Sequence, residues 1–186
     1  AYSDGWDVTE NLVHHLQSPY SYREAGDMND EEFLNHLANN MIDKINELGP
    51  ENIAAFIAEP IMGAGGIIVP PEGYHQKMRE ITNEYEIMYI ADEVVTAFGR
   101  LGHMFASQDK YNMTPDIICT AKGLTSGYQP LSATIISDEI YDVISEPGAM
   151  FLHGMTYSGH PAASAAALAN IDTVSYTHLR AHETDR

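Results

Sequence analysis

The chain has 186 residues, which is enough for one domain with a substantial hydrophobic core. Its 27 acidic and 9 basic side chains give a formal charge of −18, so we expect no nucleic acid and no anionic membrane as a partner, because both would repel it. The single cysteine, Cys119, excludes an internal disulfide and favours a cytoplasmic location, and no apolar run approaches the roughly 20 residues of a membrane span.

Residues 1–27 show no clear periodicity, and we expect an irregular surface segment there. The adjacent His14 and His15 would point in different directions and have no third ligand nearby, so no metal site is predicted. Residues 29–48 predict a helix with a regular apolar stripe. Asn29 is its expected N-cap, with a glutamate three residues on, and a Gly-Pro pair ends it.

Three apolar runs each end in an ionisable residue. Residues 52–60 predict a strand that ends on Glu59, residues 87–95 predict one that reaches Asp92, and a short run leads to Lys122. The three residues are 33 and 30 positions apart, and a strand, a crossover helix and the next parallel strand take about 30 residues or more. We therefore expect the three side chains at the carboxyl ends of parallel strands, the edge where open α/β sheets bind ligands.

The plainer interpretation is that each carboxylate caps the next element and that the lysine is an ordinary surface residue. For one strand we would favour that interpretation. For three strands at this spacing we favour a site.

The segments between these strands complete an α/β pattern. Residues 62–66, MGAGG, predict a shaped loop that is neither a P-loop nor a Rossmann turn, and residues 71–85 predict a helix. Residues 132–137 predict a strand, which follows Lys122 too closely for a parallel return and should therefore be antiparallel. Residues 138–144 look helical. The expected fold is α/β, with a mainly parallel sheet and one antiparallel strand.

Pro161 begins an alanine-rich helix after a polar, glycine-bearing loop. Thr156 and Ser158 lie just before this helix, where hydroxyls can bind a phosphate, although ordinary N-capping explains a lone hydroxyl as well. We expect the alanine-rich helix to end near residue 174, where the apolar periodicity stops and the charge rises. We therefore expect residues 174–186 to be a non-native tail and residues 1–173 to be the partial domain.

A lysine and an aspartate at one sheet edge fit a specific chemistry. A neutral lysine amine forms a Schiff base with an aldehyde, and pyridoxal phosphate is such an aldehyde. A carboxylate beside its ring nitrogen keeps that nitrogen protonated, which makes the ring an electron sink. Asp92 is the candidate for this carboxylate, and Lys122 is the candidate for the amine and for the group that moves protons.

Four stretches resemble the class III pyridoxal-phosphate-dependent aminotransferases, in the branch of the ω-amino acid or amine:pyruvate transaminases. The resemblance runs from about residue 14 to residue 172. It is carried by EPIMGAGG (59–66), IADEVVTAFGRLG (90–102), AKGLTSGYQPLSA (121–133) and HGMTYSGHP (153–161). The resemblance implies the fold type I, aspartate-aminotransferase-like architecture, with this chain as part of the large, cofactor-binding domain.

The resemblance also implies roles for individual residues. Lys122 matches the Schiff-base lysine, Asp92 the carboxylate on the pyridine nitrogen, and Val94 the residue stacked on the ring. Glu59 matches the acid near the ring hydroxyl, and Thr156 matches the threonine that reaches the phosphate bound in the neighbouring subunit. Members of the family are homodimers, so a homodimer is implied as well.

The expected reaction moves an amino group from an ω-amino acid or amine to a keto acid, with pyruvate as the expected acceptor. The family's upstream phosphate loop and its small domain find no match here, so we expect an internal segment with little turnover of its own. Ala97 stands where many members have glycine. The alternatives are an aminomutase or decarboxylase of the same fold, or a domain that only binds the cofactor; a metal hydrolase is the weakest.

Overall fold

The computed structural model describes residues 12–183, with side chains as far as residue 176. The first part of the expected irregular segment and part of the expected tail lie outside the described residues. From residue 12 onward, the irregular segment is extended chain with one short helix in it. The helices and strands in chain order are α1 (Ser21–Glu24), α2 (Asp30–Leu48), η1 (Pro50–Asn52), β1 (Ala55–Ala58), α3 (Tyr74–Glu84), β2 (Met88–Asp92), α4 (Ala106–Asp109), β3 (Ile117–Thr120), η2 (Lys122–Thr125), β4 (Ala133–Ile136), α5 (Asp138–Ile144) and α6 (Pro161–Glu183).

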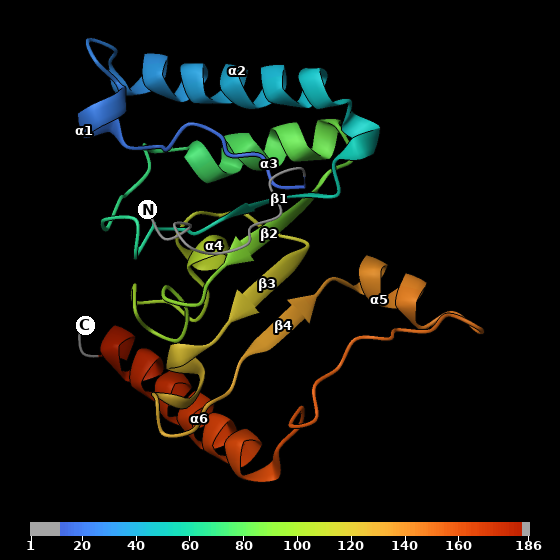
Figure 1. Ribbon diagram of the computed structural model, residues 1–186. Coiled ribbons are helices and arrows are strands. Elements are labelled where there is room, and N and C mark those ends of the chain that lie inside the picture. The colour runs from blue at the N-terminus through green and yellow to red at the C-terminus, as the bar shows by residue number, and fades with distance from the viewer. Residues whose placement is uncertain (1–11, 184–186) are drawn as a thin grey trace, which may run out of the picture.

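The four strands form one sheet in the order β1-β2-β3-β4. The β1/β2 and β2/β3 pairs are parallel, and the β3/β4 pair is antiparallel, as Figure 1 shows. This confirms the mainly parallel sheet with one reversed strand. The reversal has the expected cause, because the connection from β3 to β4 contains only the short η2 and a turn and cannot cross over the sheet.

Helix α2 begins and ends as its sequence predicts. The Asn29 side chain accepts a hydrogen bond from the Glu32 N–H at 3.0 Å, and the Glu32 carboxylate accepts from the Asn29 N–H at 2.9 Å. This capping box satisfies two donors that the first helical turn leaves free. At the other end, Gly49 takes φ +81°, a conformation that favours glycine.

The core lies between the sheet and the helices α2 and α3, which cover one side of the strands in two successive layers (Figure 1). Helix α3 starts at Tyr74 rather than at residue 71, because Gly73 in the left-handed region precedes it. The buried apolar side chains of this core recur at helical spacing on α2 and α3: Phe33, Leu37, Met41, Ile45, Tyr74, Met78 and Ile81.

Helix α6 lies apart from these two helices and packs against η2 (Figure 1). It starts at Pro161 as predicted, but it continues to Glu183, so the expected end of the helix near residue 174 was wrong. The residues from Val174 on include good helix formers that extend an existing helix without any apolar period. No helix within residues 12–183 combines the length and the hydropathy needed to cross a membrane.

Candidate active site

The sheet register places Glu59, Asp92 and Lys122 at one edge. Ala58 pairs with Ala91, so the residues that follow them, Glu59 and Asp92, stand at the same level on neighbouring strands. Asp92 pairs with Cys119, and Lys122 follows three residues later, just beyond the end of β3. Neighbouring strands are about 4.8 Å apart, so the structure brings the three predicted residues to one end of three adjacent strands.

Asp92 is half-buried, and one of its two carboxylate oxygens is already engaged. Its Oδ1 accepts a hydrogen bond from the backbone N–H of Val94 at 3.1 Å. Among the described residues, no group donates to Oδ2. Burial raises the pKa of the neighbouring Cys119 thiol, and the negative charge of Asp92 raises it further. Cys119 is half-buried.

Glu93 is fully buried, with no exposed surface, and accepts four hydrogen bonds. Its Oε2 accepts from the Thr96 hydroxyl at 2.7 Å and from the Ala106 N–H at 3.0 Å. Its Oε1 accepts from the N–H of Ser107 at 2.7 Å and from the Ser107 hydroxyl at 2.6 Å. These bonds tie the turn after β2 to the first residues of α4. The sequence pattern gave no indication of this buried role of Glu93.

Lys122 begins the short 3₁₀ helix η2 in an unusual conformation. Its φ is +37°, in the left-handed region that residues other than glycine rarely adopt. The next residue, Gly123, lies tightly against the turn after β2: a Cβ there would be 3.3 Å from the Cβ of Phe98 and 3.4 Å from the Ala97 carbonyl oxygen. The lysine side chain is exposed, and its Nζ has no hydrogen-bond or ion-pair partner among the described residues.

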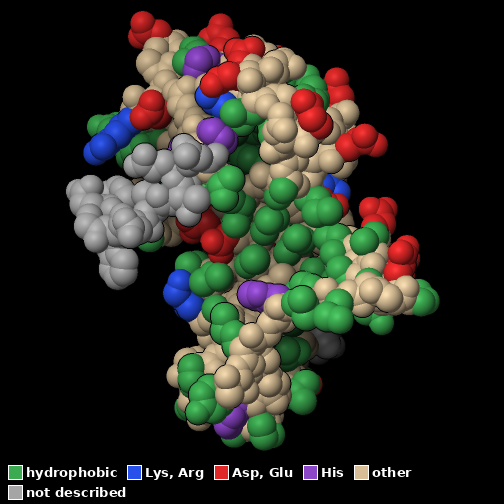
Figure 2. Space-filling model, turned by 45° about the vertical axis from the view of Figure 1, so that its right-hand side comes forward, with side chains coloured by type: hydrophobic (Ala, Val, Ile, Leu, Met, Phe, Trp, Pro, Cys, Tyr) green, Lys and Arg blue, Asp and Glu red, His purple; other side chains and the backbone are tan. Residues whose placement is uncertain are grey.

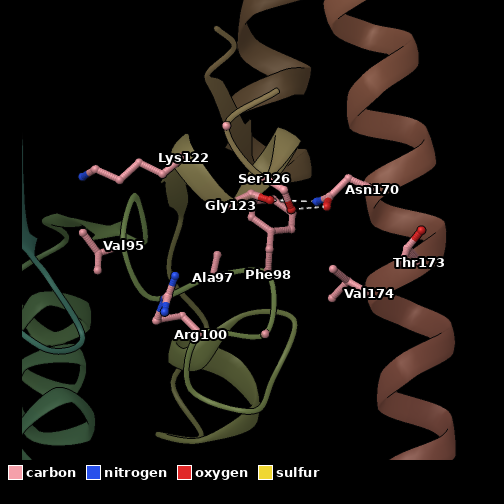
Figure 3. A pocket seen from close by; sticks show the side chains of 12 residues that line it. Val95, Ala97, Phe98, Arg100, Lys122, Gly123, Ser126, Asn170, Thr173 and Val174 are labelled. Atoms are coloured by element: carbon pink, nitrogen blue, oxygen red, sulfur yellow. Dashed lines mark hydrogen bonds between the residues drawn. The ribbon is translucent and has the colours of Figure 1, made fainter. Parts of the chain in front are cut away.

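A cavity of about 800 Å³ borders this turn. Figure 3 shows Lys122 and Arg100 on the side of the cavity away from α6, with the lysine side chain extending away from that helix. Of the five predicted site residues, only Lys122 lines this cavity. Val94 does not line it, whereas Val95 and Ala97 do. The lining residues are Val95, Ala97, Phe98, Gly99, Arg100, Lys122, Gly123, Ser126, Gly127, Asn170, Thr173 and Val174.

The loop MGAGG closes over Glu59. The Gly63 N–H donates to the Glu59 Oε2 at 2.8 Å, and a Cβ on Gly63 would lie 3.4 Å from Cγ2 of Val95. Behind this loop, the buried His75 holds the carbonyl of Pro60 through Nε2 at 3.0 Å and contacts the Tyr89 hydroxyl through Nδ1 at 2.9 Å. Burial lowers the pKa of His75, so the imidazole is neutral and donates from Nε2 to the carbonyl.

Thr156 is not part of this arrangement. It is exposed, lies in the loop before α6 and does not line the cavity that Lys122 borders. The Ser158 hydroxyl accepts from the Met155 N–H at 3.2 Å, and His160 accepts from the N–H of Ala163 at the start of α6. Neither of the two predicted hydroxyls therefore caps the helix.

One contributing residue escaped the sequence analysis. Asn170 on α6 donates from Nδ2 to the carbonyl oxygens of Gly123 and Leu124, at 2.7 and 3.1 Å. It is a lone amide in an alanine-rich helix, and that signal could have drawn attention to it. Its hydrogen-bond partners could not be predicted, however, because they depend on α6 packing against η2.

The residues present fit pyridoxal phosphate. The free Oδ2 of Asp92 can accept from a protonated ring nitrogen, and the unpaired amine of Lys122 can hold an aldehyde. The half-buried acid Glu59 lies on the neighbouring strand. These groups are what the cofactor's ring and aldehyde require, whereas the donors for its phosphate are not assembled among them.

The family of this chain follows from comparison with known proteins. The family model "Aminotransferase class-III" matches residues 2–185. The putrescine–pyruvate aminotransferase of Pseudomonas aeruginosa is 54% identical over 157 residues, which are 84% of this chain and 34% of that protein.

The chain belongs to the class III aminotransferase family.

Solved structures agree with this family. A thermostable (S)-enantioselective ω-transaminase from Thermomicrobium roseum has a TM-score of 0.92 at 44% identity, over 96% of this chain and 40% of the other. The PLP-bound amine transaminase of an uncultivated Pseudomonas species has a TM-score of 0.88 at 43% identity, with the same coverage of 96% and 40%. The predicted resemblance and the fold type I architecture are confirmed, and the chain spans about a third of the length of the curated relative it matches.

Proposed function

We propose that this class III aminotransferase segment carries the pyridoxal phosphate site of a transaminase. The enzyme moves an amino group from an ω-amino acid or amine to a keto acid, with pyruvate as the acceptor. The observation that carries the proposal is the convergence of Lys122 and Asp92 at one sheet edge, each with an unpaired functional atom among the described residues. The putrescine–pyruvate relative supports an amine donor and pyruvate.

Bound pyridoxal phosphate supplies an aldehyde that condenses with amines and a ring that accepts electrons from a bond to the substrate carbon. In this proposal, the Lys122 amine would hold the cofactor at its aldehyde and would also move a proton between carbon atoms of the substrate and cofactor. Its exposed Nζ has no local partner to hold it elsewhere.

Asp92 would hold a proton at the ring nitrogen through its Oδ2, while the Val94 N–H fixes its Oδ1. Val94 would also back the ring, although the cavity is lined by Val95 in its place. Glu59 would lie beside the ring hydroxyl, and the Gly63 N–H holds its carboxylate in place.

Thr156 would bind the phosphate of a cofactor in a second copy of the chain, which agrees with its exposed position away from Lys122. Exposed apolar side chains in the part of the chain that includes Thr156 support a homodimer. Figure 2 shows hydrophobic side chains gathered over the side of the molecule where α5 and the following segment lie. The exposed residues in this part of the chain are Tyr141, Val143, Met150, Phe151, Leu152, Met155 and Tyr157. The cytoplasmic location is part of the proposal and rests on the single cysteine.

A hybrid enzyme tests the proposal at full length. In the hybrid, this segment replaces the matching stretch of the Pseudomonas aeruginosa relative. With putrescine and pyruvate, we expect alanine to form, and Lys122→Ala should lower its rate by about 10²–10⁴-fold or more. Lys110→Ala, at an exposed lysine on the surface, is the matched control and should leave the rate unchanged. A hybrid that folds and binds the cofactor but makes no alanine would refute the proposal. So would a hybrid whose rate of alanine formation is unchanged by Lys122→Ala.

The second candidate function, an aminomutase or decarboxylase, gives a different product from the same hybrid. Carbon dioxide or an internally shifted amine would form without consuming pyruvate. The family and the relatives favour the transaminase.

A further inference from the structure

The side-chain amide of Asn170 connects α6 to the turn that carries Lys122. Its Nδ2 donates to the carbonyl oxygens of Gly123 and Leu124, and its Oδ1 accepts a hydrogen bond from the Ser126 hydroxyl. Figure 3 shows the bonds that run from Asn170 on α6 to Gly123 and Ser126. Both the nitrogen and the oxygen of the Asn170 amide therefore form hydrogen bonds with the same turn, residues 123–126.

The turn needs such support. Lys122 has φ +37° and Ser126 has φ +50°, so left-handed residues stand at both ends of η2. L-residues adopt this region only when the surroundings enforce it. The Gly123 carbonyl already accepts from the Ser126 N–H at 3.2 Å, and Asn170 adds a second donor to it and also donates to the Leu124 carbonyl.

The position of Asn170 on α6 separates this role from ordinary helix packing. Ala163 and Ala167 are buried on α6 and, with Asn170 and Val174, follow one face of the helix at intervals of four, three and four residues. An apolar residue at position 170 would complete that face and dock the helix equally well. The amide adds directed hydrogen bonds to the carbonyls of the two residues that follow Lys122.

We propose that Asn170 is a positioning residue for Lys122: it locks η2 in its strained conformation, so that the lysine amine stays at the side of the cavity away from α6. Ser126 contributes the third bond of this clamp. The importance of the lysine rests on the proposed function, whereas the clamp itself is a property of the 186-residue chain and is testable without the cofactor.

Amide hydrogen exchange of the 186-residue chain tests the clamp. The Leu124 N–H donates to the Ala121 carbonyl at 2.8 Å and the Ser126 N–H to the Gly123 carbonyl at 3.2 Å, so both amides report on η2. Asn170→Leu keeps the branching of the side chain at Cγ and removes the donors, and we expect both amides to exchange about tenfold faster or more. Ser126→Ala removes only the third bond and should accelerate the Leu124 amide less than Asn170→Leu does.

Two references separate a local effect from general unfolding. Asn39→Leu, at an exposed position of α2, is the matched control and should change neither amide. The amides of Asp116 and Ser137, which are bonded at 2.9 Å at the far end of β3 and β4, should exchange as in the unmodified chain. Equal acceleration of all four amides in Asn170→Leu, or no acceleration at Leu124 and Ser126, would overturn the proposal.

A second readout asks whether the clamp serves Lys122. The hybrid enzyme is treated with low concentrations of pyridoxal phosphate and borohydride, and the adducts on Lys122 and Lys110 are compared by peptide mass mapping. We expect Lys122 to be strongly preferred, and Asn170→Leu to reduce that preference severalfold. An unchanged preference, despite faster exchange at η2, would overturn the positioning role. A hybrid with no preference for Lys122 would refute the proposed function and leave hydrogen exchange to decide on the clamp.

Discussion

The carboxylate of Glu93 is held by Ser107 through two hydrogen bonds, from the backbone N–H at 2.7 Å and from the hydroxyl at 2.6 Å. Glu93 stands between Asp92 and Val94, the two residues whose mutual hydrogen bond shapes the end of β2. The buried glutamate therefore fixes the direction in which its neighbours leave the sheet.

Replacing Glu93 should destabilise the chain severely. Glu93→Ala leaves the N–H groups of Ala106 and Ser107 and two hydroxyls without their acceptor in a buried place, so we expect a loss of about 2–4 kcal/mol in the free energy of unfolding. Urea unfolding measures it. Glu31→Gln on the exposed surface of α2 is the control, and equal midpoints for the two variants would show that the buried bonds contribute nothing.

Cys119 reports on the charge of Asp92. Burial raises the pKa of this thiol, and the negative charge of Asp92 raises it further. Asp92→Asn should lower that pKa, so alkylation by iodoacetamide at pH 8 should become faster by a few-fold, up to about tenfold. The chain contains one cysteine, which makes the rate unambiguous.

Asp43→Asn, on the exposed side of α2, controls for the change in net charge. The difference between the two variants should shrink as salt is added, because part of it is electrostatic. Alkylation rates that do not distinguish Asp92→Asn from the control would contradict the placement of Asp92 beside Cys119.

The buried His75 makes the stability depend on pH. Burial lowers its pKa below the ordinary value of 6.5, against the opposite effects of the Pro60 carbonyl and the charge of Glu93. The unfolded chain takes up this proton first, so the contribution of His75 is complete above about pH 6.5 and is lost as the pH falls through its folded pKa.

His75→Gln should remove that dependence and also lower the stability at pH 7 by about 1–3 kcal/mol, because the Tyr89 hydroxyl and the Pro60 carbonyl lose their partner. Urea midpoints at pH 7, 6 and 5 measure both effects. His15→Gln, at an exposed histidine, should follow the unmodified chain. The prediction fails if His75→Gln loses as much stability between pH 7 and pH 5 as that control.

The sheet could be predicted because it depends on spacing along the chain. The intervals between Glu59, Asp92 and Lys122 fit parallel strands with crossovers, and the short connection after Lys122 fits a reversed strand. Helix caps also depend only on residues close together in the sequence, so the capping box between Asn29 and Glu32 could be predicted from residues 29–32 alone.

Contacts between distant segments were not readable in this way. Asn170 donates hydrogen bonds to carbonyl groups that lie 46 and 47 residues earlier in the chain. Glu93 accepts a hydrogen bond from the N–H of Ala106, 13 residues later, so its buried role depends on where α4 packs. The end of α6 was predicted wrongly. A helix whose apolar residues no longer recur at helical spacing loses its packing against the core, but it does not have to end there. The roles of Lys122, Asp92, Val94, Glu59 and Thr156 remain predictions.

The most direct test of the central claim is to locate the lysine that pyridoxal phosphate modifies in the hybrid enzyme at full length. Borohydride reduction followed by peptide mass mapping distinguishes Lys122 from Lys44, Lys77 and Lys110, of which Lys44 and Lys77 are paired with Glu47 and Glu80. We predict an adduct on Lys122 that is lost in Lys122→Ala together with alanine formation. Continued transamination by Lys122→Ala, with the adduct on another lysine, would contradict the account.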